Sequence, residues 1–180
     1  MNNTKTIFKS LLIMIVAISL FTVSCSKDEG GTKTPTNPAQ PITITAKNIT
    51  AAFKGLAKIT IGKTEIDFTK DANYTGNAIT ITGTANASAT GGIEEKAALE
   101  TKIKAGLKVS GATVDAKVTT TSFPQATDNT AIDITITITP ASGNSFAAAE
   151  EQLTPYTKTG ENVVVTLKLS PESGKKWDGK

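Results

Sequence analysis

The stretches "IDITITITPASGNSF" (132–146) and "VVVTLKLSPESGKKW" (163–177) decide the fold of this 180-residue chain. In both, apolar residues largely alternate with threonine or another polar residue, which is the period-two pattern of a strand with one buried face. Each run then reaches the motif Pro-x-Ser-Gly-x-x-aromatic, which ends on Phe146 in the first stretch and on Trp177 in the second. The motif predicts a strand that leaves a sheet through a turn and returns an aromatic side chain to the core.

Three segments upstream show related strand patterns. The segment "NAITITG" (77–83) predicts another strand that faces outward through threonine. The segments "AKITIGKTEIDF" (57–68) and "LKVSGATVDAKV" (107–118) alternate in the same way but shift phase at a glycine. Such a shift indicates a bulged strand or a tight hairpin.

Three other segments have the apolar spacing of helices. They are "NITAAFKGL" (48–56), "IEEKAALETKIKAGL" (93–107) and "SFAAAEEQLTP" (145–155). Asn48 is the expected N-cap of the first helix, and Ser145 is the expected N-cap of the third. In the second helix we expect glutamates in the first turn and an ion pair between Glu100 and Lys104, which are four residues apart.

The elements recur in one order: a helix, a strand broken by glycine, a polar turn and a threonine-faced strand. The repeats cover residues 49–83 and 93–139, and a shorter copy covers 146–177. This order predicts an α+β domain of two layers, in which a mainly antiparallel sheet built from αββ-like repeats carries short helices on one face. An all-β, immunoglobulin-like sandwich of similar strands is the structural alternative.

The start of the chain has a different pattern. Lys5 and Lys9 precede the apolar run "LLIMIVAISLFTV" (11–23), which is shorter than the roughly 20 residues of a membrane-spanning helix. The run is followed by Ser24 and by Cys25, the only cysteine in the sequence. A basic start, a short apolar run and a small residue are the three regions of a secretory signal.

This segment resembles the lipobox of bacterial lipoproteins, in the relaxed form of spirochaete and Bacteroidetes-type lipoproteins, with Thr22 three residues before Cys25. The resemblance implies a signal peptide over 1–24, cleavage between Ser24 and Cys25, and fatty-acyl chains such as palmitate on the cysteine. The next residues, "SKDEGG" (26–31), resemble the acidic tract that directs such proteins to the outer face of the outer membrane. One acyl chain holds a protein only marginally, whereas two or three anchor it stably. We therefore expect a lipid-anchored protein of the outer membrane, exposed at the cell surface.

The composition divides the chain after the predicted signal peptide into two parts, a tether and a domain. Residues 25–41 mix glycine, proline, threonine and charged residues with almost no apolar side chain, which favours a flexible, solvated tether. Residues 42–180 are enough for a single globular domain with its own core.

Several residue types that enzymes and nucleic-acid-binding proteins use are missing. Histidine is absent, which removes the usual general base and the commonest transition-metal ligand. Every basic residue is lysine, and without the signal 17 lysines face 16 carboxylates, so no nucleic-acid partner is expected. With its one cysteine at the anchor, the chain is expected to have no disulfide, no cysteine-bound metal and no cofactor.

One polar segment, "DANYTGN" (71–77), has the spacing of a calcium-binding loop. Asp71, Asn73 and Thr75 occupy the first, third and fifth positions, where such a loop supplies oxygen ligands. Thr82 takes the place of the closing glutamate. A polar hairpin turn is therefore the better interpretation, and no metal is expected.

Large amphipathic aromatic residues are few. Tyr74, Tyr156 and Trp177 are candidates for contact with a sugar or protein ligand, although the repeated motif also gives Trp177 a role in the core. The glutamate pairs at 94–95 and 150–151 favour helix starts over catalysis, because neighbours on a helix do not face each other.

The sequence predicts a non-enzymatic surface lipoprotein whose tethered domain binds a protein or glycan of a host or of the cell's own envelope, or forms part of a coat. The alternative is a periplasm-facing accessory or inhibitory subunit of an envelope complex. A hydrolase that uses carboxylates alone is a third hypothesis, which requires two carboxyl groups about 5 to 10 Å apart across a cleft.

Overall fold

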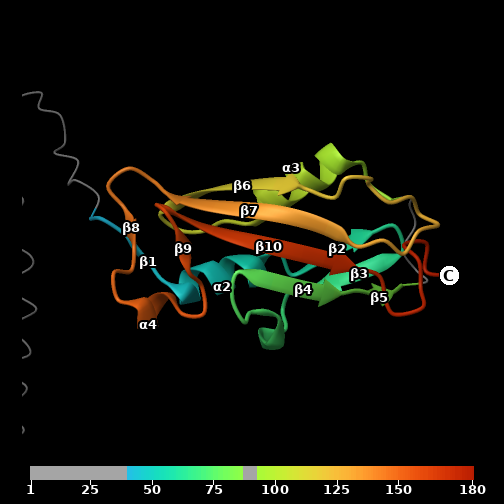
Figure 1. The fold of residues 1–180 in the computed structure, drawn as a ribbon, viewed down its shortest axis with the longest axis horizontal. Coiled ribbons are helices and arrows are strands. Elements are labelled where there is room, and N and C mark those ends of the chain that lie inside the picture. The colour runs from blue at the N-terminus through green and yellow to red at the C-terminus, as the bar shows by residue number, and fades with distance from the viewer. Residues whose placement is uncertain (1–39, 87–92) are drawn as a thin grey trace, which may run out of the picture. The chain divides into compact units, whose positions relative to one another are not determined.

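The structure is a computed structural model that describes residues 40–86 and 93–180, so the predicted signal peptide and Cys25 lie outside the described residues. The described part contains three α-helices and ten strands (Figure 1). The helices are α2 (Ala46–Gly55), α3 (Lys96–Gly106) and α4 (Glu150–Leu153), together with the 3-10 helix η1 (Asp71–Asn73). The strands are β1 (Thr43–Ile44), β2 (Lys58–Ile61), β3 (Thr64–Asp67), β4 (Ala78–Thr82), β5 (Thr84–Ala85), β6 (Ala112–Val118), β7 (Ile132–Pro140), β8 (Ser145–Phe146), β9 (Lys158–Thr159) and β10 (Asn162–Ser170). None of the described helices is both long enough and apolar enough to cross a membrane.

The main sheet has the strand order β4, β10, β7, β6, and the short β9 also pairs with β10. Its two central strands, β7 and β10, are the two stretches whose alternation is clearest in the sequence. They pair antiparallel, with Val165 opposite Ile136. β6 also pairs antiparallel with β7, whereas β4 pairs parallel with β10. The predicted two-layer α+β fold with a mainly antiparallel sheet is confirmed.

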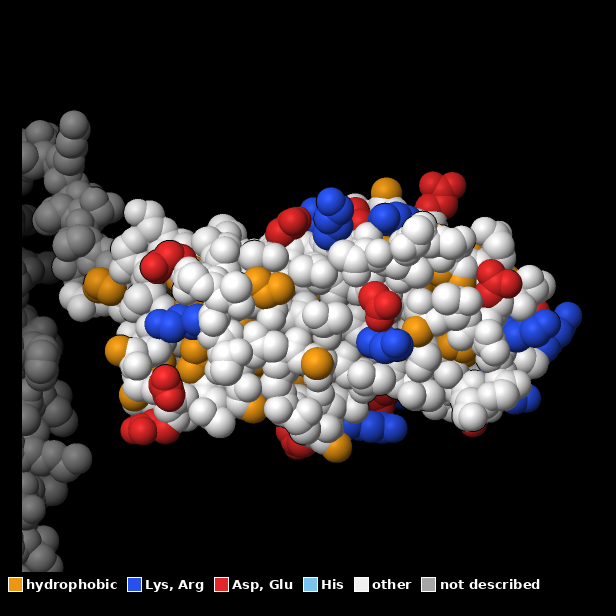
Figure 2. Space-filling view, viewed as in Figure 1, with side chains coloured by type: hydrophobic (Ala, Val, Ile, Leu, Met, Phe, Trp, Pro, Cys, Tyr) orange, Lys and Arg blue, Asp and Glu red, His pale blue; other side chains and the backbone are white. Residues whose placement is uncertain are grey.

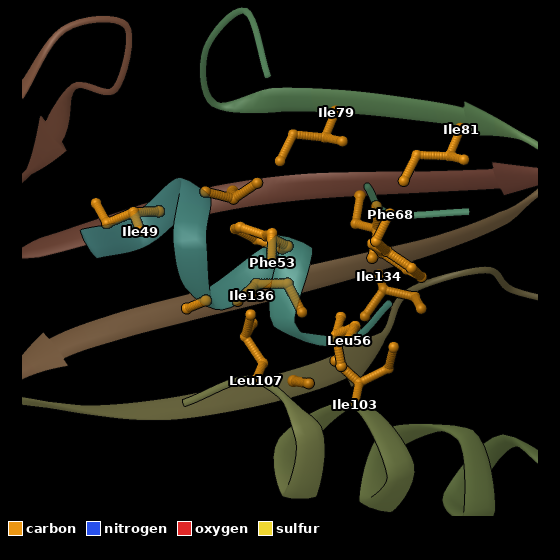
Figure 3. Packing of buried hydrophobic residues seen from close by; sticks show 14 of the residues in the cluster. Ile49, Phe53, Leu56, Phe68, Ile79, Ile81, Ile103, Leu107, Ile134 and Ile136 are labelled. Atoms are coloured by element: carbon orange, nitrogen blue, oxygen red, sulfur yellow. The ribbon is translucent and has the colours of Figure 1, made fainter. Parts of the chain in front are cut away.

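The helices α2 and α3 lie on one face of the main sheet, and the opposite face is turned toward the viewer in Figures 1 and 2. On the helix side, the alternate residues Ile132, Ile134, Ile136 and Ile138 of β7 are fully buried. They pack with Ile49 and Phe53 of α2 and with Ile103 of α3 (Figure 3). Burial of each such side chain contributes roughly 1.5–3 kcal/mol, so this layer contributes strongly to the driving force for folding.

The two longer repeats differ in how they use the strand that is broken by glycine. In the first repeat (49–83), the alternation changes phase at Gly62 because the chain forms a hairpin there. Ile61 pairs with Thr64 around a two-residue loop. Gly62 has φ 60°, as the first loop residue of a type II′ turn requires. The hairpin β2–β3 joins β5 in a separate three-stranded sheet. In the second repeat no strand precedes Gly111, and β6 joins the main sheet instead.

The predicted start of the third helix is wrong. Ser145 and Phe146 were expected to cap and begin it, but they form β8, which pairs in parallel with β1. Ser145 donates its backbone N–H to the Ile42 carbonyl at 3.2 Å, and the side chain of Phe146 is buried. The helix α4 begins only at Glu150. Pairing with a distant strand therefore overrides the local helical pattern.

The starts of the helices also differ in detail from the prediction. Thr45, not Asn48, is the N-cap of α2, and the two side chains form a capping box in which Thr45 donates its N–H to Asn48 Oδ1 at 2.9 Å. Glu95 is the N-cap of α3, so no glutamate lies in the first turn of that helix. The prediction that the second glutamate pair lies at a helix start is confirmed, because Glu150 and Glu151 lie in the first turn of α4.

The repeated Pro-x-Ser-Gly motif turns the chain as predicted. Gly143 has φ 81° and Gly174 has φ 76°, both in the left-handed region that glycine adopts easily. After each turn the aromatic residue returns to the core, where Phe146 is 6% exposed and Trp177 is 0% exposed.

Candidate functional site: the open face of the main sheet

The face of the main sheet opposite the helices is a regular surface of mostly polar side chains. Its residues are the polar positions that alternate with the buried ones along the four long strands. They are Thr80 and Thr82 of β4, Asn162, Thr166, Lys168 and Ser170 of β10, Asp133, Thr135, Thr137 and Thr139 of β7, and Thr113, Asp115 and Lys117 of β6. Val164 of β10 is an apolar residue on the same face. We call this surface the open face. In Figure 2 it is mainly white, the colour of the backbone and of side chains that are neither charged nor hydrophobic.

Strand register arranges these side chains in rows. Thr135 of β7 lies between Thr166 of β10 and Lys117 of β6. Two residues along the strand, Thr137 lies opposite Asp115. Neighbouring strands are about 4.8 Å apart, and residues on the same face recur about every 6.8 Å along a strand. Hydroxyl and methyl groups therefore repeat in two directions, which suits a partner that both hydrogen-bonds and makes apolar contact.

The charges of the open face balance one another. Lys168 lies opposite Asp133 across the β7–β10 pair. Asp115 is held by Lys104 of α3, with 2.6 Å between Nζ and Oδ1. The hydrogen bond from Lys104, reinforced by its charge, holds the pKa of Asp115 below its usual range. With Lys117 as the remaining charge, two lysines of the face oppose two aspartates, so the face has no net attraction for a polyanion.

The three large aromatic residues expected to contact a ligand are all in the core. Tyr74 is 8% exposed, Tyr156 is 2% exposed and Trp177 is 0% exposed. Each polar tip is hydrogen-bonded inside the protein: Tyr74 to the Phe68 carbonyl, Tyr156 to the Thr50 hydroxyl and Trp177 to the Thr130 carbonyl. The rings therefore offer little surface to a ligand, although Tyr156 also lines the hollow of about 350 Å³ beside α4. Internal packing with a satisfied polar tip is their role.

Burial of the two tyrosines predicts a loss of stability in alkali. Burial raises the pKa of both Tyr74 and Tyr156. Because the unfolded chain loses its tyrosine protons first, near pH 10, stability is complete below that value and falls as pH rises above it. The expected slope is about 1.4 kcal/mol per pH unit for each tyrosine.

Urea unfolding of the wild type and of Tyr74→Phe, compared from about pH 8 to about pH 11, checks this prediction. The variant should lose less stability across that range than the wild type does. Equal losses in the two proteins would mean that Tyr74 ionises as easily in the folded state as in the unfolded chain.

The segment weighed as a calcium loop forms a polar connection. Asp71 begins η1, and its carboxylate makes an ion pair with Lys54 of α2. Asn73 donates its side-chain amide to the Asp67 carbonyl at 3.5 Å, and Thr75 is exposed. Among the described residues, no three His, Cys, Asp or Glu side chains are grouped to hold a metal ion. The preferred interpretation as a hairpin turn is wrong, because β3 and β4 lie in different sheets.

The glutamate pairs lie at helix starts. Glu94 forms an ion pair with Lys102, while Glu95 caps α3. The surface hollows beside β9 and α4, of about 300 Å³ and 350 Å³, are each lined by a single carboxylate, Glu161 and Glu150 respectively. Neither hollow offers the two facing carboxyl groups that a glycosidase uses.

Sequence reasoning found the outward threonines strand by strand but missed their assembly into one surface. It also missed the charged residues that β6 adds. The alternation in "TVDAKV" (113–118) could have placed Thr113, Asp115 and Lys117 on one face, but only the strand order brings that face beside β7.

Comparison with protein-family models, curated proteins and solved structures finds no match to this chain. The fold and the site define the class: a two-layer α+β domain whose helices cover one face of the sheet and whose other face is rich in threonine.

Proposed function

We propose that this protein is a non-enzymatic lipoprotein, anchored to the outer membrane through Cys25 and exposed at the cell surface, whose domain binds a protein or glycan through the open face. The anchor and the location rest on the signal pattern at 11–25. The observation that carries the binding role is the array of hydroxyl and methyl groups on the open face, which are exposed on β4 and β6 and half-buried on the central strand β7. No described helix or strand lies over this face in Figure 1.

The chemistry of the open face favours a partner that is neutral where it binds. Threonine hydroxyls donate and accept hydrogen bonds, and their methyl groups add apolar contact without a large aromatic surface. Because the charges of the face balance, long-range attraction adds little, and affinity comes from many short-range contacts. A neutral glycan or a polar, uncharged protein surface meets these conditions.

The anchor and the orientation are tested on intact cells. Mass spectrometry of the mature N-terminus should find acyl chains on Cys25, and protease added to whole cells should remove the domain. A lipidated domain that resists the protease would instead favour the alternative, an accessory or inhibitory subunit that faces the periplasm. An unmodified Cys25 would contradict the anchor itself.

The binding surface is tested separately, with one substitution on each face of the domain. Thr137→Arg places a bulky charge at the centre of the open face and should weaken binding to glycan arrays or envelope fractions at least tenfold, or about 1.4 kcal/mol. The matched control is Thr101→Arg on the exposed side of α3. Equal binding by the two variants would exclude the open face as the binding surface.

A further inference from the structure

The free edge of β6 is a second surface, which the proposed binding role does not use. β6 pairs only with β7 among the described strands, so its other edge meets no strand. Thr119, just beyond β6, donates its N–H to Asp133 of β7, whereas Val118 donates its N–H away from β7. Because this direction alternates along a strand, the N–H and C=O groups of Val114 and Ala116 also point away from β7.

Two side chains of α3 bind residues at this edge. Glu100 Oε1 accepts the Val118 N–H at 2.8 Å, and Lys104 forms the ion pair with Asp115. Asp115 belongs to the open face while α3 packs on the opposite face, so the Lys104 side chain has to pass around the edge of β6. The ion pair between Glu100 and Lys104 expected from their spacing is therefore replaced by two contacts with β6. Charged side chains at a sheet edge are a known protection against strand pairing.

This protection is partial. The Lys104 and Asp115 side chains are 43% and 66% exposed, and ion pairs that are this exposed hold weakly. A surface hollow of about 310 Å³ lies beside the first residues of β6, lined by the α3–β6 connection and by Ala112, Thr113 and Val114. Another chain can therefore approach the start of this edge.

The sequence of β6 is complementary to itself in an antiparallel arrangement. With Ala116 opposite Ala116 of a second copy, Asp115 lies opposite Lys117 of that copy, and Lys117 lies opposite its Asp115. The same register places Val114 opposite Val118. Ala116, Val114 and Val118 are the residues whose backbone groups point outward, so outward groups meet outward groups, as a hydrogen-bonded antiparallel pair requires. Opposite charges directly across two strands stabilise this register.

We propose that β6 docks with β6 of a second copy of this chain in this register, and that Glu100 and Lys104 hold the edge closed in the single chain. Docking would join two main sheets into one continuous sheet with one continuous open face. The occupant is a second copy because the charge pattern is complementary to itself. The inference does not depend on the lipid anchor or on a ligand of the open face.

Removal of the Glu100 and Lys104 side chains tests whether they keep the edge of β6 from pairing with a second copy. The full chain with Glu100→Ala and Lys104→Ala, purified in detergent, should form dimers in analytical ultracentrifugation with a dissociation constant at least tenfold below that of the wild type. The matched control is Lys102→Ala, which removes a neighbouring lysine of α3 that binds Glu94. A double variant that is folded by circular dichroism and no more dimeric than the control would overturn the proposal.

Charge reversal tests the register within the Lys104→Ala background. Asp115→Lys alone and Lys117→Asp alone should each weaken the dimer, and the two together should restore it. Association through exposed apolar surface would not respond in this way, so a dimer that is indifferent to all three changes would overturn the register.

A cross-linking experiment needs no substitution and remains informative if the variants fail to fold. Wild-type ¹⁵N-labelled and unlabelled chains are mixed at high concentration in solution and treated with a zero-length carbodiimide. Mass spectrometry should detect Asp115 of one copy joined to Lys117 of the other. Absence of this mixed-label product would overturn the proposal for the wild-type chain.

Discussion

Replacement of Trp177 by alanine is expected to lower the free energy of unfolding by about 3–5 kcal/mol. The side chain is fully buried, and its Nε1 donates to the Thr130 carbonyl at 2.9 Å. Alanine would leave a cavity in the core and would remove the hydrogen bond to the Thr130 carbonyl. Because small domains are stable by only about 5–15 kcal/mol, this single change would remove a large part of the total.

Urea unfolding followed by circular dichroism measures the effect, since Trp177 is the only tryptophan and the variant has no indole fluorescence. Trp177→Phe is the matched control, because it retains most of the buried ring but not the hydrogen bond, and it should cost roughly 1–2 kcal/mol. If Trp177→Ala were no more destabilising than Trp177→Phe, the indole would not fill the core as the structure places it.

The strands and the core could be predicted because burial leaves a local record in the sequence. In β7 every second residue from Ile132 to Ile138 is fully buried, and this is the alternation visible in "IDITITIT" (132–139). The same holds for α2, where the apolar spacing of residues 48–56 predicts a helix and the apolar residues Ile49 and Phe53 are buried. Wherever one face of an element is buried and the other is solvated, the pattern is enough to assign the element.

Contacts between residues that are distant in the sequence leave no such local pattern, and the predictions that depended on these contacts were wrong. Ser145 and Phe146 had a helical context, yet pairing with β1 made them a strand. Glu100 and Lys104 had the right spacing for an ion pair along a helix, yet the neighbouring β6 offered each of them another partner. In both cases a contact with a residue distant in sequence decided the outcome.

The candidate site could be predicted only in part, for a related reason. Threonine at outward positions was evident within each strand, but the open face exists because β7 and β10 pair at the centre of one sheet. The aromatic residues were ambiguous in the sequence, because an amphipathic ring suits a surface and a core equally well until the partner of its polar tip is known. Of the three, only Trp177 had a local signal for the core, the repeated Pro-x-Ser-Gly turn before it.

Gly83→Ala is expected to destabilise the domain by about 2–3 kcal/mol, at the upper end of the usual cost of overpacking. Gly83 connects β4 of the main sheet to β5 of the small sheet, and its N–H donates to the Ser170 carbonyl at 2.8 Å. A Cβ at this position would lie 2.3 Å from Thr64 Cγ2 and 2.9 Å from the Glu65 carbonyl oxygen. The Thr64 side chain is fully buried and the carbonyl belongs to the backbone of β3, so neither atom can move away easily.

The matched control is Gly55→Ala at the end of α2, where an added Cβ would meet nothing within 4 Å. Alanine there should be neutral or stabilise by up to about 1 kcal/mol, because it restricts the unfolded chain and favours the helix. Urea unfolding of both variants separates a general effect of glycine replacement from the local clash. If Gly83→Ala were as stable as Gly55→Ala, the two sheets could separate at this point without cost, and the close contact between β3 and the β4–β5 connection would not be part of the stable fold.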